Sequence, residues 1–413
     1  MRPTLLASLC VITVVAYVQR LALSAPTKII EGELGLGPED MGAVMAVWYW
    51  GYALAQLPAG WLADRLGSKP ALVLFAVAWS ALTALTGLAT GVAWLVVLWG
   101  LMGCAQAGIF PCCTKAIGAT FPPTGQAFAS GALAASMALG AAVGQRLTAK
   151  LLGALSWQQI LAWYAVPGLV WAFAFALAVP RPEASAASRF PDERSEVRAV
   201  RWSKLLTDWQ MQLLNAQQLF RAAAVAFFYT WFPRYLKETR YLTEQEAGEL
   251  AFWPPLAAMF GGLFGGVLSD WVLRRTGSVR LARQGMACVT MVVCAAVAFG
   301  AYLVTDTALA VILLCVGAFC GMACGVSAYA LAIAYGGRQV AVVFATMNMS
   351  GNVGAGLFPF VVGWLVAITG NWDLALLVFA GLFAADAVCW ALLNPKGTLF
   401  GGPEHSEKVE APA

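Results

Sequence analysis

The sequence predicts an all-α membrane protein with twelve transmembrane helices in two pseudo-symmetric six-helix bundles. Of the 413 residues, 61% are hydrophobic and only 11% are charged, whereas soluble globular proteins contain about 25% charged residues. Apolar segments of about 20 residues, the length that crosses a bilayer as a helix, follow one another along the chain. The two halves of the chain also share short motifs, which indicates an internal repeat.

Glycines, prolines and charged clusters separate the apolar segments and set their approximate ends. The first segment is predicted to stay in the protein as a helix, because it is longer than the core of a signal peptide and contains Arg20. The twelve predicted spans are residues 5–27, 41–63, 71–89, 92–119, 127–154, 158–179, 210–236, 248–269, 284–304, 307–335, 340–368 and 374–393.

A polar segment from Arg181 to Asp208 divides the spans six and six, and its composition is typical of a linker. We therefore predict an N-terminal bundle over residues 1–180, a cytoplasmic linker over 181–208, a C-terminal bundle over 209–394 and a cytoplasmic tail over 395–413. Lysine and arginine concentrate in this linker and in the loops after the second and eighth spans. The positive-inside rule then predicts a multi-pass protein of the cell inner membrane with both termini in the cytoplasm.

Several classes of function are excluded by what the sequence lacks. The single histidine, His405, lies in the polar tail, and the ten cysteines all fall inside apolar segments. No G-x-x-x-x-G-K-[ST] motif is present, so the chain has no ATP-binding loop of that kind. We expect a monomer with no metal site, no cofactor and no nucleic-acid partner. An enzyme is the least favoured class, because no cluster of His, Asp and Glu exists to do chemistry.

The second and eighth spans end in related motifs, G-W-L-A-D at 60–64 and G-V-L-S-D at 266–270. The longer segment G-W-L-A-D-R-L-G-S-K at 60–69 resembles the signature between helices 2 and 3 of the major facilitator superfamily. Three further segments resemble its organic anion:cation symporter branch, which includes sugar-acid and vesicular glutamate transporters: residues 51–67, T-W-F-P-R-Y-L at 230–236, and the Asn348–Asn352 motif. This resemblance covers the whole chain and implies the major facilitator fold, with the substrate between the halves near the middle of the membrane.

Two of the arginines inside predicted spans, Arg20 and Arg221, are candidates for binding the substrate. An arginine at the centre of a membrane helix costs roughly 2.5–3.5 kcal/mol on insertion scales, so such residues usually face a cavity or a partner. Arg20 lies in the first span, which contains no acid, and the resemblance implies that it binds the substrate's carboxylate. Arg221 lies in the seventh span and precedes Pro233 at the spacing of an arginine in vesicular glutamate transporters. The alternatives are that Arg20 bonds backbone carbonyls and locks two helices, and that Arg221 extends to the membrane surface.

Further polar side chains are candidates for tuning the shape of the substrate site. They are Tyr17, Tyr52, Gln56, Asn348 and Asn352. Each lies one helical turn from another candidate or from Arg20, so the members of a pair share a helix face. The resemblance implies that Tyr52 faces the substrate and supports the same role for the two asparagines. The alternatives are hydrogen bonds between helices for the amides and packing for the aromatic rings.

Three charged residues at the ends of the repeated motifs are predicted to control gating. Asp64 and Arg65 end the second span, and Asp270 is the weaker copy of Asp64 at the end of the eighth. An acid at this position can pair with basic residues or helix ends while the cytoplasmic gate is shut. Breaking that contact favours the inward-open state.

The chain departs from the family pattern where coupled protons are expected. Related symporters place an aspartate immediately before the arginine of span 1 and a glutamate five residues before a proline of span 4. This chain has Gln19 and Gln106 there. Glutamine keeps hydrogen bonding but cannot titrate, so Gln106 remains a candidate for substrate binding while conventional proton symport is in doubt. The acid that remains well inside a span is Asp386, in a helix that usually packs outside the transport cavity.

The sequence therefore predicts a secondary active or facilitative transporter of small organic anions, of the monocarboxylate or sugar-acid type. An uncoupled or potential-driven carrier fits the missing carboxylates, and a proton or a sodium ion stays open as coupling ion. Two alternatives are a transport-inactive nutrient sensor and an efflux transporter for lipophilic compounds. The second alternative would call for a glycine–proline motif in span 5, which residues 141–144 lack.

Overall fold

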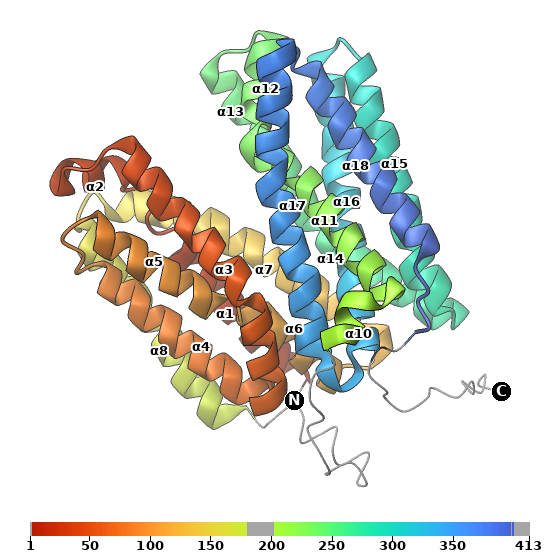
Figure 1. Ribbon diagram of the computed structural model, residues 1–413, viewed down its shortest axis with the longest axis horizontal. Coiled ribbons are helices and arrows are strands. Elements are labelled where there is room, and N and C mark those ends of the chain that lie inside the picture. The colour runs from red at the N-terminus through yellow and green to blue at the C-terminus, as the bar shows by residue number, and fades with distance from the viewer. Residues whose placement is uncertain (1, 180–201, 398, 400–413) are drawn as a thin grey trace. The chain divides into compact units, whose positions relative to one another are not determined.

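The computed structural model describes residues 2–179, 202–397 and 399, and every regular element in these residues is a helix (Figure 1). The helices up to residue 178 are α1 (Arg2–Arg20), α2 (Thr27–Leu34), α3 (Pro38–Leu66), α4 (Ser68–Thr86), α5 (Val92–Gln106), α6 (Ile109–Thr120), α7 (Pro123–Leu151) and α8 (Trp157–Ala178). Those from residue 202 onward are α10 (Trp202–Thr207), α11 (Trp209–Thr230), α12 (Phe232–Arg240), α13 (Glu244–Ala251), α14 (Trp253–Thr276), the π-helix η2 (Arg280–Gly285), α15 (Met286–Leu303), α16 (Thr307–Gly336), the 3₁₀ turn η3 (Gly337–Gln339), α17 (Val340–Thr369) and α18 (Asp373–Leu392).

Within the described residues, ten helical segments are long and apolar enough to cross a membrane. α3 and α11 are not among the ten, because both contain many polar and aromatic residues, including Tyr52, Gln56 and Arg221. With these two helices the described part of the chain contains twelve membrane-length segments, and the predicted all-helical membrane fold is confirmed. The two exceptions are helices that contain predicted site residues.

The chain separates into two compact units. The first holds the described residues within 1–121 and 135–200, and the second holds those within 122–134 and 201–413. α7 therefore contributes its first three turns to the second unit and its remainder to the first. The predicted linker between the bundles falls largely on residues 180–201, which lie outside the described residues, so its form stays a prediction.

The first predicted span ends earlier in the structure than the sequence suggested. α1 stops at Arg20, the chain turns through residues 21–26, and the short helix α2 follows. Pro26 is the N-cap residue of α2 and disfavours the helical conformation at Ala25, which keeps α2 separate from the turn before it. Arg20 is therefore the last residue of its helix and not a mid-helix residue, and a cation at this end is stabilised by the helix dipole by about 0.3–1 kcal/mol.

Two other predicted spans are each built from two helices. The fourth is broken at Ala107 and Gly108, between α5 and α6. A Cβ atom on Gly108 would lie 2.1 Å from the ring of Phe75, so a glycine is required for this close approach of α6 to α4. The seventh span is broken at Trp231, between α11 and α12, two residues before Pro233, whose ring cannot continue the helix hydrogen bonds.

Glycines also set the closest helix contacts inside each unit. In the first unit, Gly103 of α5 lies against the backbone of Trp48 on α3, at 2.3 Å between its ideal Cβ position and the carbonyl oxygen. In the second unit, the ideal Cβ position of Gly354 on α17 lies 2.2 Å from the carbonyl oxygen of Leu219 on α11. Small residues at helix contacts let backbones approach in membranes, where packing replaces the hydrophobic effect. These contacts fix α3, which contains Tyr52 and Gln56, and α11, which contains Arg221.

Candidate functional site

The guanidinium group of Arg20 lies among three aromatic rings of the first unit. Its Cζ atom is 3.7 Å from the ring centroid of Trp48, 4.7 Å from that of Tyr17 and 4.8 Å from that of Tyr52. Trp48 and Tyr52 are stacked on each other at 4.9 Å, one turn apart on α3. We refer to Tyr17, Trp48 and Tyr52 as the aromatic cage of Arg20.

The aromatic cage holds the cation without neutralising it. The Nε atom of Arg20 is buried and has no hydrogen-bond partner, and none of the ion pairs between described residues includes Arg20. Ring faces attract a guanidinium by about 0.5–2 kcal/mol but accept no conventional hydrogen bond from its edge. The donors along the edge of Arg20 are therefore available to a carboxylate, which a guanidinium binds in bidentate geometry.

The glutamine of α3 is unusual in its burial. Gln56 has 0% of its surface exposed, and neither its Oε1 nor its Nε2 atom has a hydrogen-bond partner. Leaving both groups unpaired costs roughly 1–3 kcal/mol each, so a buried amide of this kind calls for a functional explanation. Gln56 lies one turn beyond Tyr52, on the same helix as the cage.

The two glutamines that replace family carboxylates are used inside the first unit. Gln19 is 0% exposed and donates to the backbone oxygen of Tyr164 at 2.6 Å, which links α1 to α8. Gln106 is 2% exposed and donates to the backbone oxygen of Ala16 at 3.0 Å, which links α5 to α1. Both amides therefore brace α1, the helix that ends at Arg20, and Gln106 does not extend into open space in this conformation.

In the second unit, Arg221 is 7% exposed and lies against α16. Its Nη2 atom donates to Oε1 of Gln218 at 2.7 Å, while its Nε atom has no partner. A Cβ atom on Gly325 would lie 3.0 Å from Nη1, and one on Gly351 would lie 2.9 Å from the Cγ atom of Gln218. The two glycines thus leave the room that Arg221 and Gln218 occupy. The guanidinium is buried among helices.

The predicted asparagines lie on α17, which packs against α11. The side chain of Asn352 donates to the backbone oxygen of Asn348 at 2.8 Å, so part of its hydrogen-bonding capacity is used within its own helix. Both side chains are partly exposed. Together with Arg221 they belong to the second unit, whereas Arg20, Tyr17, Tyr52, Gln56 and Gln106 belong to the first.

The first predicted gating motif contains an ion pair. Asp64 at the end of α3 pairs with Lys115 of α6 at 2.9 Å, and the Lys115 ammonium also donates to the backbone oxygens of Ala63 and Asp64 at 3.2 and 3.1 Å. Arg65 is exposed and lies over the ring of Trp61 at 5.2 Å. Gly67 follows with a φ of 89°, in the left-handed region that favours glycine, which explains the glycine of the motif at the α3–α4 turn.

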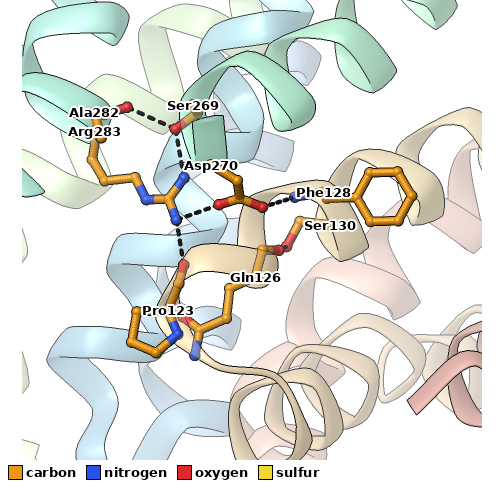
Figure 2. Close-up of polar contacts among 8 residues, drawn as sticks. All are labelled: Pro123, Gln126, Phe128, Ser130, Ser269, Asp270, Ala282 and Arg283. Carbon is orange, nitrogen blue, oxygen red and sulfur yellow. Dashed lines mark hydrogen bonds and ion pairs between the residues drawn. The ribbon is translucent and has the colours of Figure 1, made fainter. Parts of the chain in front are cut away.

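The second motif holds a more deeply buried network, shown in Figure 2. Asp270 is 1% exposed and pairs with Arg283 of η2 at 2.7 Å, while its other oxygen accepts the backbone N–H of Phe128 at 2.8 Å. Arg283 also donates to Ser269 and, at 2.6 Å, to the backbone oxygen of Pro123. Asp270 therefore ties the first turns of α7 to α14 and η2. The Asp270 side chain is also more deeply buried than that of Asp64, at 1% against 8% exposed.

Four residues that contribute to these sites were not predicted from the sequence. Trp48, Lys115 and Arg283 complete the cage and the two ion pairs, and Gly325 makes room for Arg221. A lysine inside the predicted span 92–119 is an intramembrane charge, so Lys115 had a detectable signal. Trp48 and Gly325 had none, because aromatic residues and glycines are frequent throughout membrane helices.

Comparison with known proteins agrees with this architecture. The model of the Major Facilitator Superfamily matches residues 6–336. A probable sulfoacetate transporter of Cupriavidus necator is 27% identical over 99% of this chain and 97% of its own length. A probable galactarate/D-glucarate transporter of Escherichia coli K12 is 26% identical, covering 92% and 90%, and a hexuronate transporter of Bacillus subtilis is 28% identical, covering 91% of each.

The solved structures that match share the fold at low sequence identity. The transporter FucP in its outward conformation superposes with a TM-score of 0.74 at 15% identity, over 94% of this chain and 98% of FucP. The human organic anion transporter MFSD10 gives a TM-score of 0.69 at 13% identity, with the same coverage of each chain.

Proposed function

The chain belongs to the Major Facilitator Superfamily and is a membrane transporter, not an enzyme; on that premise we propose that it carries small organic anions, of the monocarboxylate or sugar-acid type, by alternating access. The observation on which this rests is the Arg20 guanidinium, which the aromatic cage holds in place while no acid of the described residues forms an ion pair with it. A fixed, unpaired cation beside buried polar groups is a site for an anion.

Arg20 is proposed to bind the carboxylate of the substrate, with Tyr17, Tyr52, Gln56 and Gln106 shaping the site. Gln56 supports this role, because its buried and unpartnered amide can donate to and accept from a hydroxylated acid. In the second unit, Arg221 is proposed as a further cation for the same substrate, with Asn348 and Asn352 beside it on α17. Such a division of charge would couple binding to closure, since alternating access moves one bundle relative to the other around the substrate.

The names of the relatives narrow the substrate class. Sulfoacetate, galactarate, D-glucarate and hexuronates are all small, polar organic anions, and the proteins named for them match this chain over about its whole length. We propose that the substrate of this chain belongs to the same class. An efflux transporter of lipophilic compounds is less well supported, because the polar residues of α3 and α11 suit a hydrophilic substrate.

Asp64, Arg65 and Asp270 are proposed to stabilise a state with the cytoplasmic gate shut. The pairs Asp64–Lys115 and Asp270–Arg283 support this role, because each joins separate helices at the ends of the repeated motifs. We further propose that both termini face the cytoplasm, that the protein lies in the cell inner membrane, and that it works as a monomer. The cations of residues 181–204 and 274–283 support this orientation.

Counterflow in proteoliposomes tests the function directly. Vesicles loaded with unlabelled sulfoacetate or D-glucarate are expected to take up the same labelled anion when they contain the wild-type protein. Arg20→Ala is expected to abolish this exchange while the purified variant stays folded. The matched control is Arg275→Ala, because Arg275 is an exposed arginine over the ring of Trp271 at 5.8 Å. Unchanged exchange by Arg20→Ala would refute the proposed role.

A thermal-shift screen distinguishes the substrate classes. A ligand that binds only the folded protein raises its melting temperature by mass action. Organic acids are expected to raise it, and the shift is expected to disappear in Arg20→Ala. A shift by lipophilic compounds alone would favour the efflux function instead.

A further inference from the structure

An apolar groove runs along the seam between α15 and α18 in the second unit. The two helices lie side by side (Figure 1), and the Cys288 thiol donates to the backbone oxygen of Ala387 at 3.7 Å. The groove has a volume of about 350 Å³, within the roughly 300–1,000 Å³ of ligand sites in proteins. Besides these two residues, the lining of this α15–α18 groove includes Val292, Ala295, Ala384, Val388 and Ala391.

Small side chains create the groove, and larger exposed side chains border it. Four of the lining residues are alanines, whereas Val292 and Val388 are 54% and 58% exposed. The lining covers two turns of each helix, about 10 Å along the axis. In a protein that spans a membrane, exposed apolar surface on a spanning helix lies in lipid, because water solvates it poorly. The groove is therefore elongated and apolar, as an acyl chain requires.

One end of the groove lies next to η2. The Nε2 atom of Gln284 donates to the backbone oxygens of Trp390 and Ala391, at 3.0 Å each, so η2 covers the last turn of α18. Ala391 also lines the groove, together with Cys288 in the first turn of α15. The groove thus begins where the two membrane-length helices meet η2, and it continues from there along both helices.

A glycine and an arginine extend this end of the groove. Gly285 lies three residues before Cys288, on the same helix face. Its ideal Cβ position is 3.5 Å from the backbone oxygen of Arg280 and 4.0 Å from a methyl carbon of Leu281, so no other helix fills the space beside it. In a π-helix such as η2, residues five apart lie one turn from each other, which places Arg280 one turn beyond Gly285.

The charges around η2 are those of a basic surface. Arg280 is exposed, and none of the ion pairs between described residues includes it. Arg274, at the end of α14, is exposed as well. Residues 271–305 contain no acid, and Asp270 is already paired with the buried Arg283. Cations beside a membrane span attract phospholipids whose headgroup has a net negative charge.

We propose that the α15–α18 groove binds an anionic phospholipid, with one acyl chain in the groove and the phosphate of the headgroup over Gly285. The guanidinium of Arg280 donates to the phosphate oxygens, which its planar group can bind in bidentate geometry. The alanines of α15 and α18 contact the chain, and Gly285 leaves space for the headgroup. This site is separate from the cation at Arg20 and requires no assumption about the transported substrate.

Native mass spectrometry of the purified protein tests the site with two lipids, palmitoyl-oleoyl phosphatidylglycerol and palmitoyl-oleoyl phosphatidylcholine. Both contain the same chains and a phosphate, but only the first has a net negative charge. We expect a one-to-one complex in which phosphatidylglycerol is preferred about fivefold, the effect of one cation near the headgroup. Arg280→Gln should remove this preference. Ala384→Trp, which fills the groove from an exposed position, should remove the complex with either lipid.

Two matched controls should behave as the wild type. Ala296→Trp adds the same ring at an exposed alanine of α15 outside the lining, and Arg274→Gln removes an exposed cation of α14. Phosphatidylglycerol should also raise the melting temperature of the wild type and of Ala296→Trp but not of Ala384→Trp, since a ligand of the folded state stabilises it.

Four results would overturn the proposal. The first is equal binding of the two lipids by the wild type, and the second is an unchanged complex in Ala384→Trp. The third is an equal loss of the preference in Arg274→Gln and Arg280→Gln, which would indicate diffuse attraction without a site. The fourth is a protein dimer that Ala384→Trp separates, which would make a second copy of the chain the occupant. Arg280→Gln changes an exposed side chain, so it keeps the test decisive if Ala384→Trp fails to fold.

Discussion

The carboxylate of Asp270 and the guanidinium of Arg283 form a buried ion pair at 2.7 Å, with side-chain exposures of 1% and 3%. The same carboxylate accepts the N–H of Phe128, so one acidic side chain joins α14, η2 and the start of α7 (Figure 2). Breaking a buried pair by removing one partner costs about 3–5 kcal/mol, because the remaining charge is left without compensation.

Asp270→Asn is therefore expected to destabilise the protein strongly and to lower its melting temperature. The double variant Asp270→Asn/Arg283→Gln should lose clearly less stability than the sum of the two single variants, because it leaves no uncompensated charge. The control is the exposed pair Arg234–Glu238, at 3.6 Å, where removal of one partner should cost at most about 1 kcal/mol. Additive losses at Asp270 and Arg283 would contradict the coupling.

Asp64→Asn is expected to be milder than Asp270→Asn. Lys115 loses its ion-pair partner but keeps the backbone oxygens of Ala63 and Asp64 as acceptors, so its charge is still partly compensated. Parallel thermal unfolding of the two variants in the same detergent checks this order. A larger loss for Asp64→Asn would show that the Lys115 network, and not the Arg283 network, is the stronger contact.

Trp48→Leu is expected to weaken substrate binding with little loss of maximal rate. The Trp48 ring centroid is 3.7 Å from the Arg20 guanidinium, and a desolvated cation–π contact contributes about 2 kcal/mol, or roughly a thirtyfold change in KM if it is lost. Transport kinetics with labelled sulfoacetate measure the effect. Trp271→Leu is the control, because Trp271 packs under an exposed arginine at 5.8 Å; an equal rise in KM in both variants would argue against the cage.

Gly325→Ala is expected to displace the Arg221 guanidinium. The added methyl group would lie 3.0 Å from Nη1, which is closer than ordinary packing allows. Anion affinity, measured by thermal shift or by KM, should fall, whereas the stability of the unliganded protein should change little because the side chain can rotate away. Gly381→Ala on α18 is the control, since no atom lies within 4 Å of its ideal Cβ position. Equal affinities in the two variants would contradict the proposed position of Arg221.

The N-terminus of α13 is expected to be sensitive to acid. The backbone N–H of Thr243, and then its hydroxyl group, donate to Glu246 and lower the pKa of that carboxyl group from its ordinary 4.5. Because the pKa is lowered in the folded state, the ionised Glu246 carboxylate stabilises the folded protein above pH 4.5. This stabilisation disappears as the pH falls through the lowered pKa. Amide hydrogen exchange at α13, corrected for its intrinsic pH dependence, should accelerate at pH values below that pKa. The variant Glu246→Gln should remove this pH-dependent acceleration.

Composition and hydropathy were sufficient to predict the all-helical membrane fold, because nearly every membrane span must bury a continuous apolar surface in lipid. The sequence placed the ends of several spans less well. The first span is predicted to reach residue 27, although α1 ends at Arg20. The fourth and seventh spans are predicted as single helices, although each contains a break. Apolar residues continue through these breaks, so hydropathy alone does not mark them.

Sequence reasoning also identified Arg20, Arg221, Asp64 and Asp270 as unusual, since a charge inside or beside an apolar run is visible without coordinates. It could not identify their partners. Trp48 lies 28 positions after Arg20 and Arg283 lies 13 positions after Asp270, in different helices, and nothing in the order of residues joins them. Asp386 is fully buried on α18, and neither of its carboxyl oxygens has a hydrogen-bond partner among the described residues.

Composition and short repeated motifs were enough to predict that this chain spans a membrane, repeats in two halves and holds positive charge inside its helices. Which of those charges are neutralised depends on how the helices pack. Lys115 and Arg283 are paired with Asp64 and Asp270, Arg20 is held by aromatic faces, and Arg221 donates to Gln218. The reason is that the energy of a buried charge depends on the few groups within several ångströms of it, and helix packing alone brings those groups together.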